Sequence, residues 1–322
     1  MKNMLIIDGH SDFLEASLDR NIHIDNKDLM FNLEDAYKNR PYIQLASIFV
    51  HTKYIQKGNG YTRAVDMLNK FVKEYEQFKD KYRLEKIIDT NSLNKVVTQN
   101  KIGILLTIEN LGLIGSEISK IKEFYDKGVS VMSFTWNDQN LLASGAKTIN
   151  DIGITKYGYK CIDEINKLGI TIDVSHLSKK SFKDLMKINQ NRIVATHSCV
   201  RKLCDNTRNL DDYEIKYIAE CNGFIGINFY NKFLTDKKSY ATIDDVIDHI
   251  TYIANLVGIN YVGIGSDFDG IEANDLPIGI KGVKDIENLI DRLITRGFSN
   301  YEIEKIMGKN IYNYFLKSNL QI

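Results

Sequence analysis

The sequence predicts an α/β protein with the (β/α)8 architecture of a TIM-like barrel. Eight short apolar runs, rich in β-branched residues, recur along the 322 residues. Segments with helical spacing separate most of these runs, and alternating strands and helices in this number indicate a parallel barrel. The length also fits one such barrel, which typically needs about 250 residues before insertions.

The eight expected strands are mostly continuous apolar runs. Parallel strands that are covered on both faces have this pattern, whereas half-exposed strands alternate apolar and polar residues. The runs cover residues 4–8, 43–50, 102–109, 129–136, 170–176, 192–198, 223–229 and 261–268. Each is short enough for a strand and is bounded by charged or turn-forming residues.

The expected helices lie between these runs, over residues 64–78, 118–128, 159–169 and 243–258. Gly128, Gly169 and Gly258 stand at their ends, where a left-handed C-cap residue is favoured. A last amphipathic helix is expected over 301–318, after a loop around 271–285. Only two prolines occur and no low-complexity tract is present, so we expect one domain over residues 1–322.

Composition narrows the expected partners and location. Lysine plus arginine and aspartate plus glutamate each number 42, which leaves no net charge to attract nucleic acid. The first residues form a short apolar run without a cleavage pattern, and no apolar run is long enough to span a membrane. We therefore expect a cytoplasmic protein without a membrane partner. Its four cysteines form no CxxC pair and are expected to be reduced packing residues.

Reactive side chains follow the ends of several expected strands, where the active site of a barrel is built. They are His10 and Asp12 after the first, Glu109 at the end of the third, His176 after the fifth, His197 after the sixth, and Asp267 and Asp269 after the eighth. Burying such groups without partners costs several kcal/mol, about 2–7 for a neutral polar group. Two histidines, a His-x-Asp pair and a glutamate at one barrel mouth are a nitrogen and oxygen set that suits zinc.

The remaining histidines lack this convergence. His23 lies in a polar stretch, His51 follows the second strand and His249 falls within an amphipathic helix. We expect them to have surface, loop-support and packing roles respectively, with His51 placed nearest to the mouth.

Several motifs together resemble those of the membrane dipeptidase family, also called renal dipeptidases, which are binuclear zinc peptidases. They run in order along nearly the whole chain: IDGHSDF, TIENLGLIG, FTWNDQNLLASGA, IDVSHLS, VATHSCVRKLCDNTRNLDD, YVGIGSDFDGI and GKNIYNYF. Each motif alone is moderately specific, and their order and spacing make the combined signal strong. The resemblance implies a (β/α)8 barrel of the metal-dependent hydrolase type.

The resemblance also implies roles for individual residues. It places His10 and Asp12 on one Zn²⁺ and His176 and His197 on a second, with Glu109 bridging the two ions of each chain. It assigns proton handling beside the metal-bound water to Asp267 and makes Asp269 a support for that loop. Arg208, in TRNLDD, is implied to receive the terminal carboxylate of a dipeptide, for which a planar guanidinium is suited.

One departure from the family pattern concerns the substrate. Where several members have a histidine that contacts the substrate, this sequence has Trp136, which donates one hydrogen bond but transfers no proton near neutral pH. Metal binding is expected to be intact, and the substrate preference is expected to differ. The chain looks like the soluble microbial type of the family, and only this resemblance leads us to expect a homodimer.

The activity expected from the resemblance is hydrolysis of a dipeptide amide, including dipeptides with a D-residue at the C-terminal position, by a bridging zinc-bound hydroxide. Zinc lowers the pKa of bound water from about 15.7 towards about 7 and polarises the carbonyl. Asp267 would take the proton from this water and return it to the leaving nitrogen.

Two other functions stay open from the sequence. One is an amidohydrolase or lactonase of the same barrel class, in which a modified lysine after the fourth strand commonly bridges the metals; here the fourth run ends FTWN and Glu109 is the available carboxylate. The other is a non-catalytic metal-binding homologue. A closed structural zinc site needs only four ligands, so Asp267 and Arg208 favour an enzyme.

Overall fold

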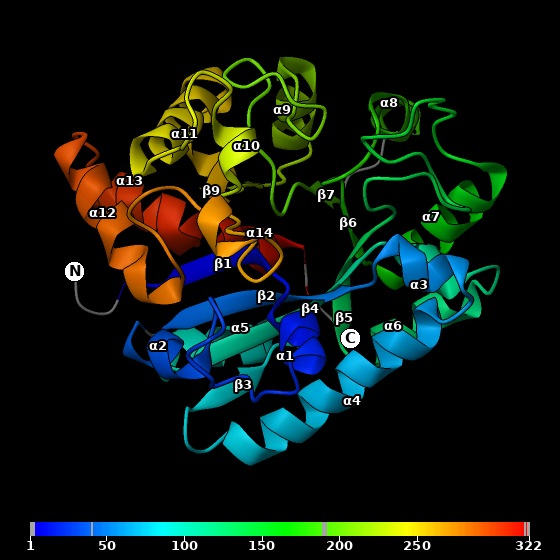
Figure 1. Cartoon of the computed structure of the whole chain (residues 1–322), viewed down its shortest axis with the longest axis horizontal. Helices are drawn as coiled ribbons and strands as arrows, with labels where there is room; N and C mark the ends of the chain where they lie inside the picture. The colour runs from blue at the N-terminus through cyan, green and yellow to red at the C-terminus, as the bar shows by residue number, and fades with distance from the viewer. Residues whose placement is uncertain (1–3, 40, 189–191, 319, 321–322) are drawn as a thin grey trace.

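The computed structural model contains a barrel of parallel strands surrounded by helices (Figure 1). It describes residues 4–39, 41–188, 192–318 and 320. The strands are β1 (Ile6–Ser11), β2 (Tyr42–Phe49), β3 (Leu84–Lys86), β4 (Ile102–Glu109), β5 (Val129–Ser133), β6 (Thr171–Asp173), β7 (Ile193–Val194), β8 (Ile225–Ile227) and β9 (Val262–Ile264).

Eight of these strands follow one another around the barrel in the order β7-β6-β5-β4-β2-β1-β9-β8. The ring is completed by a parallel bridge between Ala195, just after β7, and Ile225 in β8. The short strand β3 lies outside this ring and pairs with the first residues of β4, whereas β5 pairs with its last residues. The predicted (β/α)8 barrel is therefore confirmed, with the carboxyl ends of all eight strands at one mouth.

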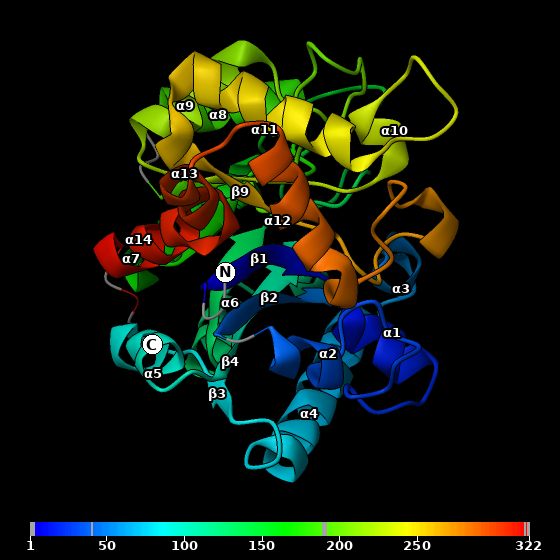
Figure 2. The ribbon, with the colours of Figure 1, turned by 90° about the vertical axis from the view of Figure 1, so that its left-hand side faces the viewer.

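Helices cover the outside of the barrel in both views (Figures 1 and 2). The α-helices are α1 (Phe13–Asp19), α2 (Leu33–Lys38), α3 (Thr52–Gln56), α4 (Gly60–Phe78), α5 (Thr90–Thr98), α6 (Ser119–Asp126), α7 (Lys156–Leu168), α8 (Lys179–Lys187), α9 (Asp212–Glu220), α10 (Asn231–Leu234), α11 (Ile243–Val257), α12 (Ile286–Thr295), α13 (Asn300–Glu304) and α14 (Asn310–Lys317). The 3-10 turns are η1 (Leu111–Ile114), η2 (Ile259–Tyr261), η3 (Ala273–Asp275) and η4 (Val283–Asp285), and η5 (Lys305–Lys309) is a π-helical turn between α13 and α14.

The two faces of each strand pack into different parts of the core. Ile43, Leu45 and Leu105 belong to one apolar cluster with Ile311 and Phe315 of α14. Their neighbours of opposite parity on β2 and β4 belong to the large cluster beneath the surrounding helices. Because side chains alternate along a strand, the same face of β4 that carries Leu105 carries Glu109 at the carboxyl end.

The predicted strands are all present, and several are shorter than their apolar runs. β5 ends at Ser133, three residues before the predicted end. Beyond this point, side chains form hydrogen bonds with backbone groups that would otherwise pair between strands. Ser133 accepts from the Asn110 N–H, and Asn140 donates to the Phe134 carbonyl. The sequence analysis did not predict the short strand β3, two of whose three residues are charged. It also named no helix at α1, α2, α3, α5, α8, α9, α10 or α12.

Among the described residues, no helix combines the length and the apolar character that crossing a membrane requires. The predicted helices are present within a few residues of their expected bounds, and Gly169 caps α7 with the left-handed conformation that the sequence predicts. The stretch 301–317 is helical and ends one residue before the predicted bound, and its middle turn is π-helical instead of α-helical.

Candidate active site

The barrel mouth gathers the polar side chains that follow its strands. His10 lies in β1 and Glu109 is the last residue of β4, so both are held by the sheet itself. Asp12, His176, His197 and Asp267 lie one to three residues beyond their strands. All six are buried, with at most 9% of their surface exposed.

Glu109 lies between two of the predicted metal ligands. Its Oε2 is 2.9 Å from His10 Nε2, and its Oε1 is 3.0 Å from His176 Nε2. Asp12 Oδ1 lies 3.6 Å from the same nitrogen of His10. One carboxylate thus presents an oxygen to each side of the centre, which is the arrangement that a bridging ligand requires.

His197 completes the group. Its Nε2 is 3.0 Å from His176 Nε2, and its ring centroid is 3.8 Å from that of His10. The possible ligand atoms form overlapping sets that lie within 4.8 Å of one another: Glu109 with His176 and His197, His10 with Asp12 and Asp267, and His10 with Asp173 and His197. The structure therefore brings together all five predicted metal-binding residues.

The hydrogen bonds of the opposite ring nitrogens turn the histidines towards this centre. His176 Nδ1 is 3.1 Å from Asn137 Oδ1, an acceptor, so this nitrogen carries the proton. Thr196 Oγ1 donates to Asp173 Oδ2 at 2.5 Å and lies 2.8 Å from His197 Nδ1. Since the single hydroxyl proton goes to the carboxylate, Thr196 accepts from His197 Nδ1. The Nε2 atoms of His176 and His197 are therefore unprotonated, and each has a lone pair that can bind a metal.

Burial and neighbouring charges set the protonation of the centre. Burial lowers the pKa of His176 and of His197 well below the usual value, and the cations Arg208 and, for His176, Lys147 act in the same direction. Burial also raises the pKa of Glu109. For His10, burial opposes the charged form, but the carboxylates of Asp12 and Glu109 outweigh it and raise its pKa well above the usual value.

The donor set fits a metal centre. Within the described part of the chain, His10 Nε2 and Asp12 Oδ1 are buried and make no hydrogen bond of good geometry, although Glu109 Oε2 lies 2.9 Å from that nitrogen. The facing Nε2 lone pairs of His176 and His197 likewise have no proton between them. Buried polar atoms normally have partners, and a cation bound among these nitrogens and carboxylates would provide one for each.

Asp267 reaches the centre from a strained turn after β9. Its φ is +64°, and that of Asp269 is +67°, both in the left-handed region. Asn228 donates to Asp267 Oδ2 at 2.9 Å, and burial raises the pKa of Asp267. Gly270 closes the turn so tightly that a Cβ would overlap Asp12 Oδ2 and lie 2.6 Å from Asp267 Oδ1.

Asp269 fastens this turn to the segment after α1. Its carboxylate oxygens accept the backbone N–H groups of Met30 and Phe31 at 2.9 and 3.0 Å. Asp8 holds the other side, since it accepts the Ser266 N–H at 2.8 Å and the Ser266 hydroxyl. These two aspartates fix the backbone that carries Asp267.

A pocket of about 270 Å³ opens beside the centre. Asp12, Glu109, His176 and Asp267 form its floor. Its walls are Phe49, Trp136, Asn137, Lys147, Tyr230, Phe233, Gly270, Ile271, Glu272 and Asp275. The Trp136 ring lies 6.4 Å from that of His176 and 4.8 Å from that of His51. The position at which the sequence departs from the family pattern is thus part of the pocket wall.

Arg208 lies behind the pocket instead of lining it. It is 3% exposed, donates to the His197 carbonyl at 3.3 Å and lies over the Phe233 ring at 5.3 Å. Its Nε is buried and has no hydrogen-bond partner within the described residues. A buried guanidinium with an unused donor next to the pocket is available to an anion.

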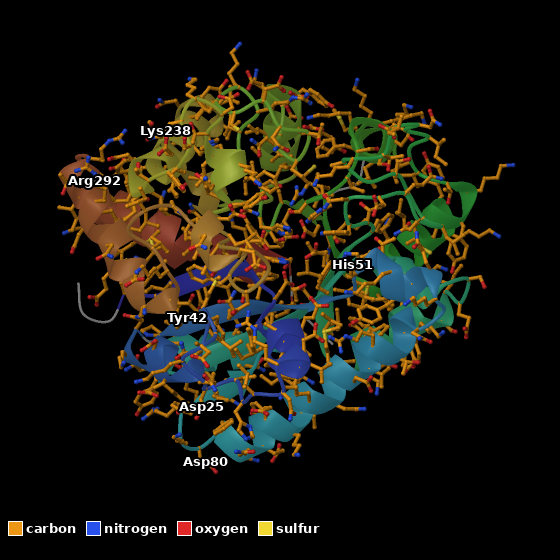
Figure 3. All side chains as sticks on the ribbon, viewed as in Figure 1. Asp25, Tyr42, His51, Asp80, Lys238 and Arg292 are labelled. Atoms are coloured by element: carbon orange, nitrogen blue, oxygen red, sulfur yellow. The ribbon has the colours of Figure 1, made fainter. Side chains whose placement is uncertain are left out.

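The other histidines contact different groups. His249 accepts from the Val200 N–H and donates to the Leu234 carbonyl, which is the expected packing role. His51 caps α3 by accepting from the Lys53 N–H. Figure 3 labels His51 just beyond the end of β2, and Tyr42 marks the beginning of that strand. His23 pairs with Glu74, and the four cysteines form no disulfide bond with one another.

Comparison with known proteins agrees with this geometry. The profile of the membrane dipeptidase family, peptidase family M19, matches residues 1–317. The chain belongs to the membrane dipeptidase family. An uncharacterized dipeptidase of Schizosaccharomyces pombe is 34% identical to this family member over 226 residues, which are 67% of this chain and 53% of that protein. The chain thus spans about half the length of that curated relative.

Solved structures share the fold of this M19 chain. A metallopeptidase of Rhodobacter sphaeroides, crystallised with a phosphinate mimic of the dipeptide L-Ala-D-Ala, has a TM-score of 0.87 at 20% identity and covers 98% of this chain and 100% of its own. The M19 metallopeptidase dipeptidase AC has a TM-score of 0.89 at 22% identity, with 99% of each chain covered. A probable dipeptidase of Pseudomonas aeruginosa has a TM-score of 0.84 at 20% identity, covering 99% and 96%.

The sequence reading missed the residues that orient this M19 centre. Asp173 and Thr196 position His197, Asn137 positions His176, and Asn228 holds Asp267. A carboxylate within an apolar run, as in ITIDVSH, and a threonine directly before a histidine are weak signals that point to them. Only the fold shows which ring nitrogen each contacts.

Proposed function

We propose that the protein is a zinc-dependent dipeptidase that binds two Zn²⁺ per chain. The observation that carries this proposal is the position of Glu109, which presents one oxygen to His10 and the other to His176. His10 and Asp12 would hold one ion, His176 and His197 the other, and Glu109 both. When bound, the metals would supply a water of lowered pKa and polarise the scissile carbonyl.

Asp267 is the proposed proton carrier. Its carboxylate lies at the pocket floor beside Asp12, and Asn228 fixes one of its oxygens. Burial raises the pKa of this carboxyl, which brings it nearer to the range in which a group accepts and returns a proton at neutral pH. It would accept a proton from the attacking water and give it to the leaving nitrogen.

Arg208 is the proposed anchor for the terminal carboxylate, and its unused Nε supports this role. Binding a charge remote from the scissile bond would orient the amide over the centre. The volume of about 270 Å³ is in keeping with a small substrate. We extend the proposal to dipeptides with a D-residue at the C-terminal position, because a structural relative was crystallised with a mimic of L-Ala-D-Ala. The cytoplasmic location and the homodimer stay predictions.

Replacement of Asp267 by Asn tests the proton role. We expect kcat/KM for a dipeptide to fall about 100- to 10,000-fold, the usual contribution of general acid-base catalysis. Zinc content, measured by elemental analysis, should be unchanged because Asn228 and the metal ligands remain. A variant that retains near wild-type turnover with full zinc would mean that another residue carries the proton.

Metal content and turnover together test the proposed enzyme. We expect two zinc ions per chain and hydrolysis of L,L and L,D dipeptides that a chelator abolishes and zinc restores. Amidation of the substrate should impair turnover if Arg208 holds its carboxylate. Two zinc ions without dipeptide cleavage would instead support a different amide substrate or a non-catalytic role, and a protein that binds no divalent metal would contradict the site.

A further inference from the structure

The pocket wall carries opposite charges on its two sides. Lys147 lies in the long segment between β5 and α7, and Glu272 and Asp275 lie in the segment that follows β9. In the order of strands around the barrel, β5 and β9 are four positions apart in either direction. The segments that follow them therefore start on opposite sides of the mouth, and both contribute charged side chains to the lining of the same pocket.

Lys147 is held at the pocket by its backbone. Its N–H donates to the Asn137 carbonyl at 2.9 Å, and the preceding N–H, of Ala146, donates to the His176 carbonyl at 2.8 Å. Gly145 packs so closely against Trp136 that a Cβ would overlap the Trp136 carbonyl oxygen. The start of the Lys147 side chain is thus fixed next to the wall formed by Trp136 and Asn137.

The ammonium group of Lys147 makes no hydrogen bond or ion pair with any side chain in the described part of the chain. Across the ranges that the structure describes, no carboxylate lies within ion-pairing distance of its Nζ, and the nearby Asp138 accepts from Thr52 instead. Among the described residues that line this pocket, Lys147 is also the one lysine or arginine. A cation that faces a substrate pocket without a counter-ion is available to pair with an anionic group of the ligand.

If the chain has the function proposed above, the positions of the positive and negative side chains in the pocket would orient a bound dipeptide. A free α-ammonium group would face Glu272 and Asp275 on the β9 side, which places the N-terminal residue there. The C-terminal residue would then lie on the side of β5 to β7, with its carboxylate near Arg208 and its side chain near Lys147. We propose that Lys147 selects dipeptides whose C-terminal residue has an acidic side chain.

Trp136 provides a direct measurement of this selection because it is the only tryptophan of the chain and lines the pocket. Its fluorescence would be titrated with uncleavable reduced-amide analogues of Ala-Asp and Ala-Asn, in both configurations of the second residue. For the configuration that binds better, we expect the wild-type protein to bind the aspartate analogue about two- to fivefold more tightly than the asparagine analogue, as for a solvent-accessible ion pair. Lys147→Met should abolish this preference, and Lys147→Glu should reverse it.

Lys160→Met is the matched control, since Lys160 is an exposed lysine of α7 outside the pocket, and it should retain the wild-type preference. Equal binding of the two analogues by the wild-type protein, or a preference that survives in Lys147→Met, would overturn the proposal. Hydrolysis of the neutral dipeptide Ala-Ala is measured separately. A protein that binds with the expected preference but fails to cleave Ala-Ala contradicts the proposed activity alone.

Discussion

The two halves of the barrel are built differently. β1, β2, β4 and β5 have 6, 8, 8 and 5 residues, and β2 pairs with β4 in an unbroken parallel register from Tyr42 and Ile102 to Phe49 and Glu109. β6, β7, β8 and β9 have only 3, 2, 3 and 3 residues. In the second half, hydrogen bonds to side chains replace some of the backbone hydrogen bonds between strands. For example, Asp173 accepts the backbone N–H groups of Ser175 and Thr196.

This difference shows that regular strand pairing ends earlier in the half of the barrel whose turns carry functional side chains. The long strands provide a rigid frame that ends in His10 and Glu109. The short strands release the backbone early, so that turns with positive φ at His176 and Asp267 direct these side chains to the centre. Backbone strain of this kind persists only where surrounding contacts enforce it, and it is common at functional sites.

The largest expected effect comes from adding a methyl group in the second half. A Cβ on Gly265 would overlap the Thr196 carbonyl oxygen, a backbone atom held between strands. We expect Gly265→Ala to lower the free energy of unfolding by about 3 kcal/mol, the upper end of the usual cost of overpacking. Urea unfolding followed by circular dichroism measures this change.

Gly103→Ala is the matched variant in the long half. Its Cβ would meet the tip of the Ile87 side chain at 2.6 Å, and side chains rotate away more readily than backbone. We expect a loss of about 1 kcal/mol, the lower end of the same range. Equal losses in the two variants would show that the two halves tolerate crowding alike.

Asp173→Asn tests whether the side-chain network of the short strands tunes the metal centre. The variant replaces a carboxylate that accepts the Thr196 hydroxyl proton. Without this acceptor, the hydroxyl is free to rotate and its hydrogen bond from His197 Nδ1 is no longer enforced. We expect zinc affinity to fall about 10- to 100-fold, as for other groups that orient metal-bound histidines. Competition with a chelator measures it, and Thr196→Ser, which keeps the hydroxyl, should bind zinc like the wild type. Unchanged affinity in Asp173→Asn would remove this residue from the centre.

The last expected effect is a pH dependence of stability at the turn after β9. Burial raises the pKa of Asp269 from its usual 3.8 to about 6, so between these values the native state binds more protons than the unfolded state. The contribution of Asp269 to stability is therefore full below pH 3.8 and is lost as the pH rises through 6. Asp269→Asn should weaken this decline in the metal-free protein, and asparagine tolerates the positive φ at this position.

Unfolding in urea at several pH values between 4 and 7 compares the two proteins. The exposed Asp28 provides a control, since Asp28→Asn should follow the wild-type curve. If the wild-type protein and Asp269→Asn lose stability in parallel over this window, burial of Asp269 does not govern the effect.

The sequence predicted the barrel well because buried parallel strands have a distinctive apolar pattern. It located all eight barrel strands, and strand-end position was enough to bring His10, Glu109, His176 and His197 to one mouth. It failed for β3 (Leu84–Lys86), in which two of the three residues are charged, and it extended β5 beyond Ser133. In both cases the deciding interactions come from other parts of the chain, which local patterns do not contain.

Local sequence determined the kinds of side chains at the mouth, because periodicity decides which residues end a buried strand and which face they occupy. Tertiary structure decided what each nitrogen and oxygen contacts. The orientation of His197 depends on Thr196 and Asp173, and the presence of Lys147, Glu272 and Asp275 in one pocket lining depends on the closure of the barrel. Such relations join residues that are distant along the chain, so they arise only when the barrel closes.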